Sequence, residues 1–173
     1  MKYGVFITGT DTGIGKTFVS GALVRACVES GRDAAYMKPV ASGCTRRGDK
    51  LVCEDVTWVR DRCGLDDKDE SMCPVRYETP ASPFQASLRE GNRYSVESVQ
   101  KAFSEICRHE FVVVEGIGGL AVPLTEREYV YDMVRALDLA LVIVSANRLG
   151  TVNHTLLTVE TARAKGLEVR GII

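Results

Sequence analysis

The feature that most constrains this chain is a glycine-rich turn near its start, Gly9–Thr17, which reads GTDTGIGKT. The turn directly follows the apolar run Val5–Ile7 and opens a helical pattern. This is the context of a phosphate-binding loop, in which backbone N–H groups hold phosphate oxygens. We therefore predict that Lys16 reaches terminal phosphates and that the Thr17 hydroxyl coordinates Mg²⁺. The match is not strict, because Thr10 stands where the first glycine usually lies, but a plain glycine-rich turn explains the Gly-Lys-Thr placement less well.

Apolar runs alternate with helical patterns along the rest of the chain. The runs are nearly continuous, which is what a strand buried on both faces of a parallel sheet requires. Five segments are predicted as strands: 5–7, 34–36, 111–114, 139–144 and 169–173. The alternation of strand and helix predicts an α/β fold with an open, doubly wound, mostly parallel sheet of the P-loop nucleotide-hydrolase type.

Three helices are predicted from apolar periodicity and end signals. They cover 16–30, the stretch after the N-cap candidate Ser95, and 151–165; glycines follow the first and third. In the second helix the buried stripe is predicted to comprise Val96, Val99, Phe103 and Ile106. In the first helix it is predicted to comprise Phe18, Val19, Ala22, Leu23 and Ala26.

Two stretches, 39–50 and 72–94, interrupt this rhythm and are rich in Pro, Ser, Gly and charged residues. Loops of this length in a compact domain are often functional. The length of 173 residues predicts one domain, residues 1–173. Its last strand is followed by nothing, so we expect the sequence to be truncated at the C-terminus.

The bulk composition excludes several classes of protein. The formal net charge of −1 gives no overall attraction to nucleic acid or anionic membranes. No apolar run approaches the ~20 residues of a spanning helix, and Met1–Gly4 does not resemble a signal peptide. The six cysteines form no C-x-x-C pair, which favours reduced thiols in a cytoplasmic protein over a zinc site.

Three acidic residues and one lysine are further candidates for the functional site. Glu115 follows the apolar run 111–114, at the sheet edge where open α/β sheets bind ligands, and is a candidate Mg²⁺ ligand. Lys38 follows the second strand and reaches the same edge. Glu54 and Asp55 stand together at a predicted helix start, and periodicity does not choose between them.

Four motifs together resemble the dethiobiotin synthetase family. They are Gly9–Thr17, Lys38–Gly43 (KPVASG), Val114–Gly119 (VEGIGG) and Leu149–His154 (LGTVNH). They occur in order and well spaced, and the resemblance extends from residue 3 to the end of the chain. It implies an ATP-dependent cyclo-ligase of biotin biosynthesis, cytoplasmic and homodimeric.

The resemblance also implies a role for each matching position. Lys38 and Lys16 are the catalytic residues, and Thr17, Asp55 and Glu115 serve Mg²⁺; Asp55 is preferred over Glu54 on this ground alone. Ser42, Gly150 and Thr151 bind the diamine substrate. ATP is bound by Gly13, Ile14, Gly15, Lys16, Thr17, Phe18, Asp55, Glu115, Gly116, Ile117 and Gly118. The family continues past residue 173 with adenine-recognising residues that this sequence lacks.

The implied reaction joins CO₂ to 7,8-diaminononanoate at the expense of ATP. One amine takes up CO₂ as a carbamate, ATP converts it to a carbamic–phosphoric anhydride, and the second amine closes the urea ring. The protein forms no covalent bond, so its tasks are positioning and charge stabilisation. Two lysines, a phosphate cradle and Mg²⁺ suit those tasks.

The loop 147–153 enters the third helix after the strand 139–144. A helix N-terminus favours a carboxylate. The resemblance implies that this end, around Gly150 and Thr151, receives the substrate carboxylate of the neighbouring subunit in the homodimer. An ordinary capped surface helix is the alternative.

Two other classes of protein carry a P-loop of this kind. A partitioning or septum-positioning ATPase switch uses a second lysine early in the loop, where this chain has Thr10. A small-molecule kinase usually has an arginine-rich lid, for which Arg46 and Arg47 are too few. A turnover assay with and without diamine and bicarbonate distinguishes the three.

Overall fold

The computed structural model describes residues 4–173. Residues 1–3, and with them the prediction that the chain opens without a signal peptide, lie outside the described residues. The strands are β1 (Gly4–Gly9), β2 (Ala34–Met37), β3 (Val40–Ala41), β4 (Thr45–Arg47), β5 (Lys50–Val52), β6 (Val75–Arg76), β7 (Phe111–Gly119), β8 (Ala140–Val144) and β9 (Val169–Ile172). The helices are α1 (Lys16–Glu29), α2 (Glu54–Cys63), α3 (Asp69–Met72), α4 (Pro83–Glu90), α5 (Val96–Ile106), α6 (Val130–Leu137) and α7 (Thr151–Ala164).

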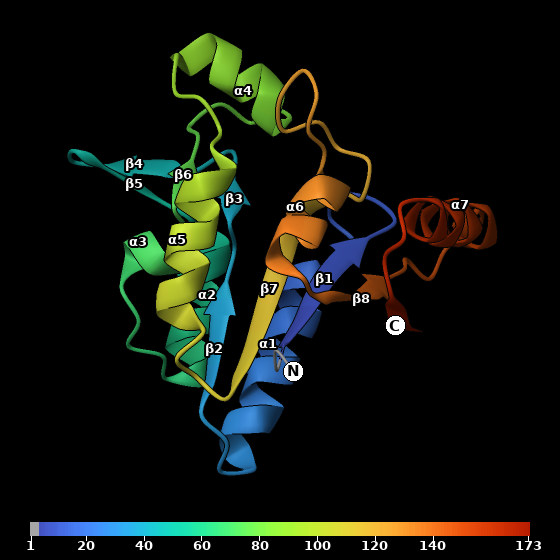
Figure 1. Cartoon of the computed structure of the whole chain (residues 1–173). Helices are drawn as coiled ribbons and strands as arrows, with labels where there is room; N and C mark the ends of the chain where they lie inside the picture. Colours follow the sequence, from blue (N-terminus) through green and yellow to red (C-terminus); the bar gives the residue numbers. More distant parts are fainter. Residues whose placement is uncertain (1–3) are drawn as a thin grey trace.

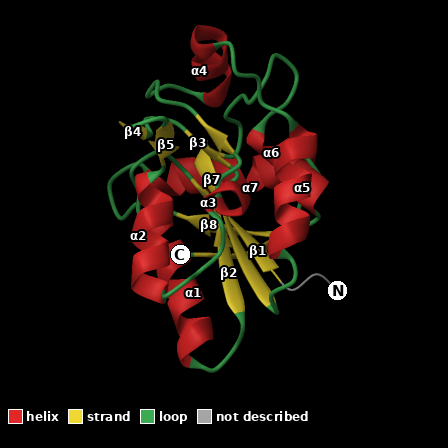
Figure 2. Ribbon diagram, turned by 90° about the vertical axis from the view of Figure 1, so that its left-hand side faces the viewer, coloured by secondary structure: helices red, strands yellow, loops and turns green. Residues whose placement is uncertain are grey.

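A five-stranded sheet in the order β2-β7-β1-β8-β9 forms the centre of the molecule (Figure 1). Every neighbouring pair in it is parallel, which confirms the predicted doubly wound parallel sheet. Helices α1 and α2 cover one face of this sheet, and α5 and α6 cover the other (Figure 2). The strand order reverses around β1, and ligands bind outside the carboxyl ends of strands at such a point.

The sheet core is apolar because its strands are buried on both faces. Phe6 and Ile7 of β1 and Val113 and Val114 of β7 are fully buried. The predicted run 111–114 is only the first part of β7, which continues to Gly119 with a shift of register against β1. Glu115 therefore lies inside the strand, opposite Ile7 and two residues before the end of β1.

The predicted buried face of α1 is partly wrong, because Val19 and Leu23 pack against the core but Phe18, Ala22 and Ala26 are exposed. The residues that α1 buries are Lys16, Ser20, Gly21 and Val24, whereas Phe18 is 68% exposed. The helix lies close against α2, and a Cβ atom on Gly21 would stand 2.7 Å from the Trp58 ring. Small side chains therefore face the interior beside Val19 and Leu23, and apolar periodicity did not indicate them.

The other two predicted helices agree with the structure. Ser95 caps α5 by accepting a 3.2 Å hydrogen bond from the Ser98 N–H, and α5 buries Val99, Phe103 and Ile106 as predicted. Helix α7 ends before Gly166, whose φ of 69° is the left-handed conformation of a helix-terminating glycine.

The stretches 39–50 and 72–94, which we expected to be loops, contain short strands and a helix. The first holds β3 and the hairpin β4–β5, and the second holds β6 and α4. Strands β3 and β6 pair with each other in parallel, and α4 stands above the carboxyl edge of the sheet (Figures 1 and 2). Short strands that pair only within these insertions lack the long apolar runs by which strands are recognised.

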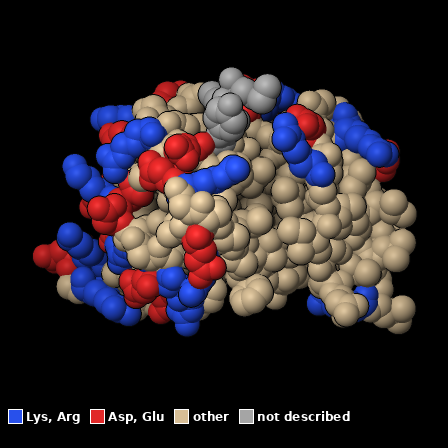
Figure 3. All heavy atoms as spheres, turned by 90° about the horizontal axis from the view of Figure 1, so that it is seen from below, with Lys and Arg blue, Asp and Glu red and all other residues tan. Residues whose placement is uncertain are grey.

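The surface carries both signs of charge. On the face shown in Figure 3, basic and acidic side chains interleave, and the right-hand part, the side on which α7 lies in Figure 1, is mostly uncharged. Within residues 4–173 we find no helix that combines the length and apolarity needed to cross a bilayer.

Candidate functional site

The phosphate-binding loop connects β1 to α1 at the carboxyl edge of the sheet. Gly13 and Gly15 have φ values of 71° and 101°, in the left-handed region that favours glycine. These conformations turn the chain sharply between strand and helix. The Lys16 side chain folds back over the turn, and its Nζ atom donates a 2.8 Å hydrogen bond to the carbonyl oxygen of Asp11.

Glu115 is the centre of the buried hydrogen-bond network beside this loop. It is 1% exposed. Its Oε1 atom accepts hydrogen bonds from Thr17 Oγ1 at 2.9 Å and Lys38 Nζ at 2.6 Å, and Oε2 accepts one from the Tyr36 hydroxyl at 2.8 Å. Both oxygens of a buried carboxylate are thus satisfied, which is the condition under which a buried charge is tolerated.

Lys38 lies between two carboxylates. Its Nζ atom is 2.6 Å from Glu115 Oε1 and 2.9 Å from Asp55 Oδ2. Burial acts to lower the pKa of Lys38, but the two carboxylates outweigh it and hold the pKa above its ordinary value. Lys38 is therefore a fixed cation in the cavity beside the phosphate-binding loop.

Lys16 has a different environment. Burial, together with the charge of Lys38, lowers the pKa of Lys16 to about 8, even though Glu115 and Asp55 act in the opposite direction. Among residues 4–173, the hydrogen-bond partner of this buried ammonium group is a single carbonyl oxygen. An acceptor that carries a charge would bind it more strongly. Phosphate oxygens would supply such an acceptor.

Most predicted site residues line one cavity of about 370 Å³, a size typical of small-molecule sites. Asp55, and not Glu54, faces this cavity, whereas Glu54 is exposed and accepts a hydrogen bond from Thr45 at 3.1 Å. The lining residues are Thr12, Gly13, Gly15, Lys16, Thr17, Lys38, Ser42, Asp55, Glu115, Ile117 and Gly118.

Three predicted nucleotide-binding residues, Ile14, Gly116 and Phe18, do not line the cavity. Ile14 packs against the core, and Gly116 packs against Phe6 so closely that a Cβ atom would stand 2.8 Å from its ring. Phe18 points to the surface, with its ring centroid 6.4 Å from that of Trp58. Within this cavity, any nucleotide contact of Ile14 would therefore come from the backbone.

The donor set fits Mg²⁺. Thr17, Asp55 and Glu115 present one hydroxyl and two carboxylates to the cavity, and Mg²⁺ prefers oxygen ligands. Within residues 4–173 no group of three His, Cys, Asp or Glu side chains is arranged to hold a metal ion by itself. Phosphate oxygens and water would complete the coordination, as is usual for Mg²⁺ in nucleotide sites.

Gly150 and Thr151 lie outside this cavity, at the start of α7. Gly150 has a φ of 92°, and no side chain caps the helix. The Thr151 hydroxyl is 2.6 Å from the Ser145 hydroxyl. This end of α7 lies near the phosphate-binding loop, because Arg148 donates a 2.7 Å hydrogen bond to the Asp11 carboxylate.

The sequence reasoning missed Tyr36, which is fully buried and bonded to Glu115. Residues two apart along a strand point to the same face, so Tyr36, the second residue before Lys38, could have been found by that rule. Arg148 was missed for a different reason. Its contact with Asp11 spans 137 residues of sequence, and no local pattern indicates it.

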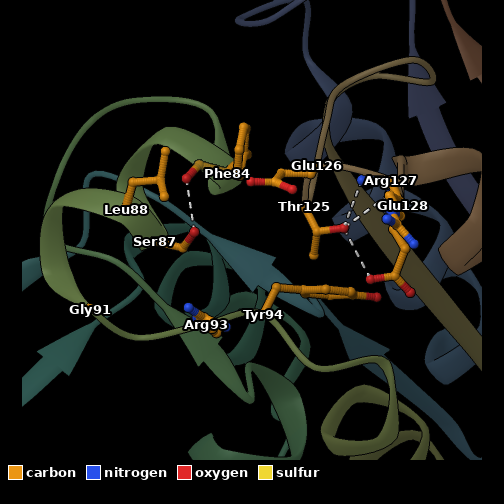
Figure 4. Close-up of a pocket in the computed structure, with 10 residues that line it drawn as sticks. All are labelled: Phe84, Ser87, Leu88, Gly91, Arg93, Tyr94, Thr125, Glu126, Arg127 and Glu128. Atoms are coloured by element: carbon orange, nitrogen blue, oxygen red, sulfur yellow. Dashed lines mark hydrogen bonds between the residues drawn. The ribbon is translucent and has the colours of Figure 1, made fainter.

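A second, larger cavity of about 680 Å³ lies between α4 and the loop 125–128 (Figure 4). Phe84, Leu88 and Tyr94 are among its lining residues, and the buried Tyr94 hydroxyl has no hydrogen-bond partner. None of the predicted site residues lines it. The phosphate-binding chemistry belongs to the smaller cavity, because the glycine turn and both lysines are there.

Comparison with known proteins identifies close sequence relatives. A family model described as an AAA domain matches residues 3–173. The ATP-dependent dethiobiotin synthetase BioD of Methanococcus vannielii is 41% identical over 170 residues, which are 98% of this chain and 77% of the relative. That of Anaeromyxobacter dehalogenans is 45% identical over 171 residues, 98% of this chain and 75% of the relative.

Solved structures share the fold at much lower identity. The kinase domain of the Escherichia coli tyrosine kinase ETK matches with a TM-score of 0.59 at 17% identity, covering 99% of this chain and 66% of that one. A ParA family ATPase from Chlorobium tepidum matches with a TM-score of 0.53 at 14% identity, covering 99% and 72%. These likenesses show a P-loop fold. The sequence relatives are more specific, and with them the chain belongs to the family of ATP-dependent dethiobiotin synthetases.

Proposed function

We propose that this protein is a dethiobiotin synthetase that uses ATP, Mg²⁺ and CO₂ to close a urea ring on 7,8-diaminononanoate. The observation that carries the proposal is Lys38, a buried cation held between Asp55 and Glu115 in the cavity of the phosphate-binding loop. The partitioning type of ATPase switch carries its second lysine inside the loop, where this chain has Thr10. A second fixed cation suits a reaction that assembles two anions, a carbamate and a triphosphate.

In this proposal each lysine stabilises a different charge. Lys16 exchanges the Asp11 carbonyl for the terminal phosphates, and Lys38 faces the oxygen that receives the phosphoryl group. Both cations are fixed by hydrogen bonds before substrate arrives, so little reorganisation is needed during the reaction. Ser42 also lines this cavity, and it would orient the diamine.

Thr17, Asp55 and Glu115 would hold Mg²⁺ in this cavity. The bound ion would neutralise charge on the phosphates during transfer. The Lys38 ammonium group lies between the two carboxylates, so it would share them with the ion and stay fixed beside the substrate.

We further propose that the working unit is a homodimer assembled through α7. The helix exposes Val152, Leu156 and Leu157, which are 69%, 57% and 59% exposed, and neighbouring Leu149 is fully exposed. Three exposed apolar side chains on one surface helix, with a fourth just before its start, indicate a protein–protein contact. The uncapped N-terminus of α7 would then accept the carboxylate of the substrate bound to the partner.

The deciding experiment measures ATP turnover with and without the diamine and bicarbonate. A dethiobiotin synthetase releases ADP and phosphate only when both are present, in step with formation of the cyclic urea. An ATPase switch, the alternative from the partitioning class, hydrolyses ATP without the diamine. A small-molecule kinase would leave phosphate on its substrate, and this outcome would overturn the proposal.

A further inference from the structure

Three cysteines form a buried cluster next to the candidate site. Cys44, Cys53 and Cys73 are 5%, 6% and 1% exposed, and all three are free thiols. The Cys53 side chain is within hydrogen-bonding reach of both Cys44 and Cys73. None of these residues belongs to the phosphate-binding machinery, so their proximity needs a separate account.

Cys44 immediately precedes β4 and Cys53 immediately follows β5, so the register of this hairpin, continued by one step, sets the two opposite each other. Its register pairs Arg47 with Lys50 and Thr45 with Val52, and one further step along the ladder pairs residue 44 with residue 53. Hydrogen-bonded and non-hydrogen-bonded pairs alternate along an antiparallel ladder. The Cys44 N–H is bonded elsewhere, to the Tyr77 carbonyl oxygen at 2.9 Å, so this pair is of the non-hydrogen-bonded kind.

This kind of pair suits a disulfide. Opposed Cα atoms in non-hydrogen-bonded pairs lie roughly 4.5 Å apart, inside the range of about 4.4–6.8 Å that disulfides span. Cys73 is the less suitable partner. It lies outside the hairpin ladder, and its thiol donates to the Val75 carbonyl oxygen at 3.6 Å.

The base of the hairpin can open without unfolding the main sheet. Strands β4 and β5 pair only with each other, and all three residues of β4 are exposed. A two-stranded hairpin has little stability of its own, and this one is tied to the rest of the chain by individual hydrogen bonds such as those of Cys44 to Tyr77 and Arg46 to Glu78. Local opening therefore exposes the two thiols at a low free-energy cost compared with global unfolding.

From this register and contact we infer that Cys44 and Cys53 form a modification site, a disulfide made by peroxide that closes the hairpin at the start of α2. Peroxide oxidises one thiol to a sulfenic acid and releases water. The second thiol attacks that sulfur, forms the S–S bond and releases a second water. The two thiols are oxidised by two electrons, and the peroxide is reduced. The cross-link ends two residues before Asp55, which contacts Lys38.

The test oxidises the native protein with hydrogen peroxide, blocks the remaining thiols and maps the cross-linked peptides by mass spectrometry. We expect the peptides of Cys44 and Cys53 to be joined with the loss of two hydrogens, reversibly by dithiothreitol. The oxidised protein should unfold at a temperature higher by roughly 5–10 °C, from the entropy of closing a loop of about ten residues.

Single variants separate this pair from the rest of the cluster. Cys73→Ala should keep both the cross-link and the shift in unfolding temperature, and Cys44→Ala should lose both. Exposed Cys107 provides the internal standard for peroxide exposure. The inference is overturned if peroxide oxidises Cys107 while residues 44 and 53 remain reduced, or if the cross-link joins residues 53 and 73. Because the readout is a bond and an unfolding temperature, it does not depend on turnover.

Discussion

The Tyr36 hydroxyl donates a 2.8 Å hydrogen bond to Oε2 of Glu115, on the opposite side of the carboxylate from Lys38 and Thr17. The tyrosine is fully buried, and this bond fixes which oxygen of Glu115 faces the cavity. Proximity to the carboxylate and burial both raise the pKa of Tyr36, burial being the larger effect. The hydroxyl therefore remains a donor throughout the working pH range.

We predict that Tyr36→Phe lowers both stability and turnover. Loss of a hydrogen bond to a buried charge should reduce the free energy of unfolding by about 1.5–3 kcal/mol, measured by urea denaturation. Turnover should fall further than stability alone explains, because Glu115 can then rotate. Tyr131→Phe, on the partly exposed ring stacked on Tyr129, is the matched control and should change neither. An unchanged Mg²⁺ dependence of turnover in Tyr36→Phe would show that the tyrosine does not position Glu115.

Replacing Lys38 with glutamine should lower turnover by about 10²-fold or more, because a preorganised charge contact with the transferring group is lost. Lys16→Gln should have an effect of similar size. Lys50→Gln removes an exposed lysine from the nearby hairpin and should leave turnover unchanged. Circular dichroism of each variant checks that the fold is intact. Wild-type turnover in folded Lys38→Gln would remove this lysine from the mechanism.

The two neighbouring acids, Asp55 and Glu54, give a sharp test of the metal site. Asp55 contacts Lys38 in the cavity, and Glu54 is bonded to Thr45 at the surface. We expect Asp55→Asn to raise the Mg²⁺ concentration that gives half-maximal turnover. Glu54→Gln should leave that concentration unchanged. The reverse pattern would assign the metal to Glu54.

The sequence predicts the parts of this molecule that depend on local patterns. The strand–turn–helix context of Gly9–Thr17 is present, with Lys16 and Thr17 at the start of α1, and apolar runs located all five strands of the main sheet. The predicted face of α1 was only partly right because the packing of this helix also depends on Trp58, which reaches Gly21 from another helix. Periodicity describes one segment at a time, and such partners become visible only when the chain is folded.

The choice of Asp55 over Glu54 illustrates a different limit. Periodicity left both acids open at the start of α2, and only the family resemblance favoured Asp55. The structure places Asp55 in the cavity because of where α2 packs relative to Lys38. That relation is tertiary, as is the contact between Arg148 and Asp11.

His109 contacts Asp33 and Asp67, which lie on two other segments of the chain. It should make the free energy of unfolding depend on pH. Its Nδ1 is 2.6 Å from Asp33 and its Nε2 is 3.1 Å from Asp67, which Arg108 also contacts. Burial lowers the pKa of His109, but the two carboxylates outweigh it and leave the pKa raised. The stabilisation from protonated His109 is therefore full below its unfolded pKa of about 6.5 and is lost as pH rises through the folded value.

We accordingly expect His109→Gln to reduce stability more at about pH 6 than at alkaline pH, above the raised pKa of His109. Urea midpoints of both proteins across this range measure the difference. A difference that stays constant with pH would mean that folding does not change the pKa of His109 and that its two contacts are ordinary hydrogen bonds.

The shared active site proposed for the homodimer is tested by joining two inactive subunits. Lys38→Gln disables the cavity of its own subunit, and Gly150→Glu places a negative charge where the partner's substrate carboxylate should bind. Co-expressed with different tags and purified as a heterodimer, the pair contains one composite site in which both halves are wild type. With two sites per symmetric dimer, we expect about half of the wild-type turnover to return.

Because Gly150 has a φ of 92°, any side chain strains the backbone there, and Gly150→Ala serves as the control for strain without charge. Sedimentation of the wild-type protein at assay concentration establishes the oligomeric state. A monomer, or a heterodimer no more active than its parents, would confine each active site to a single chain.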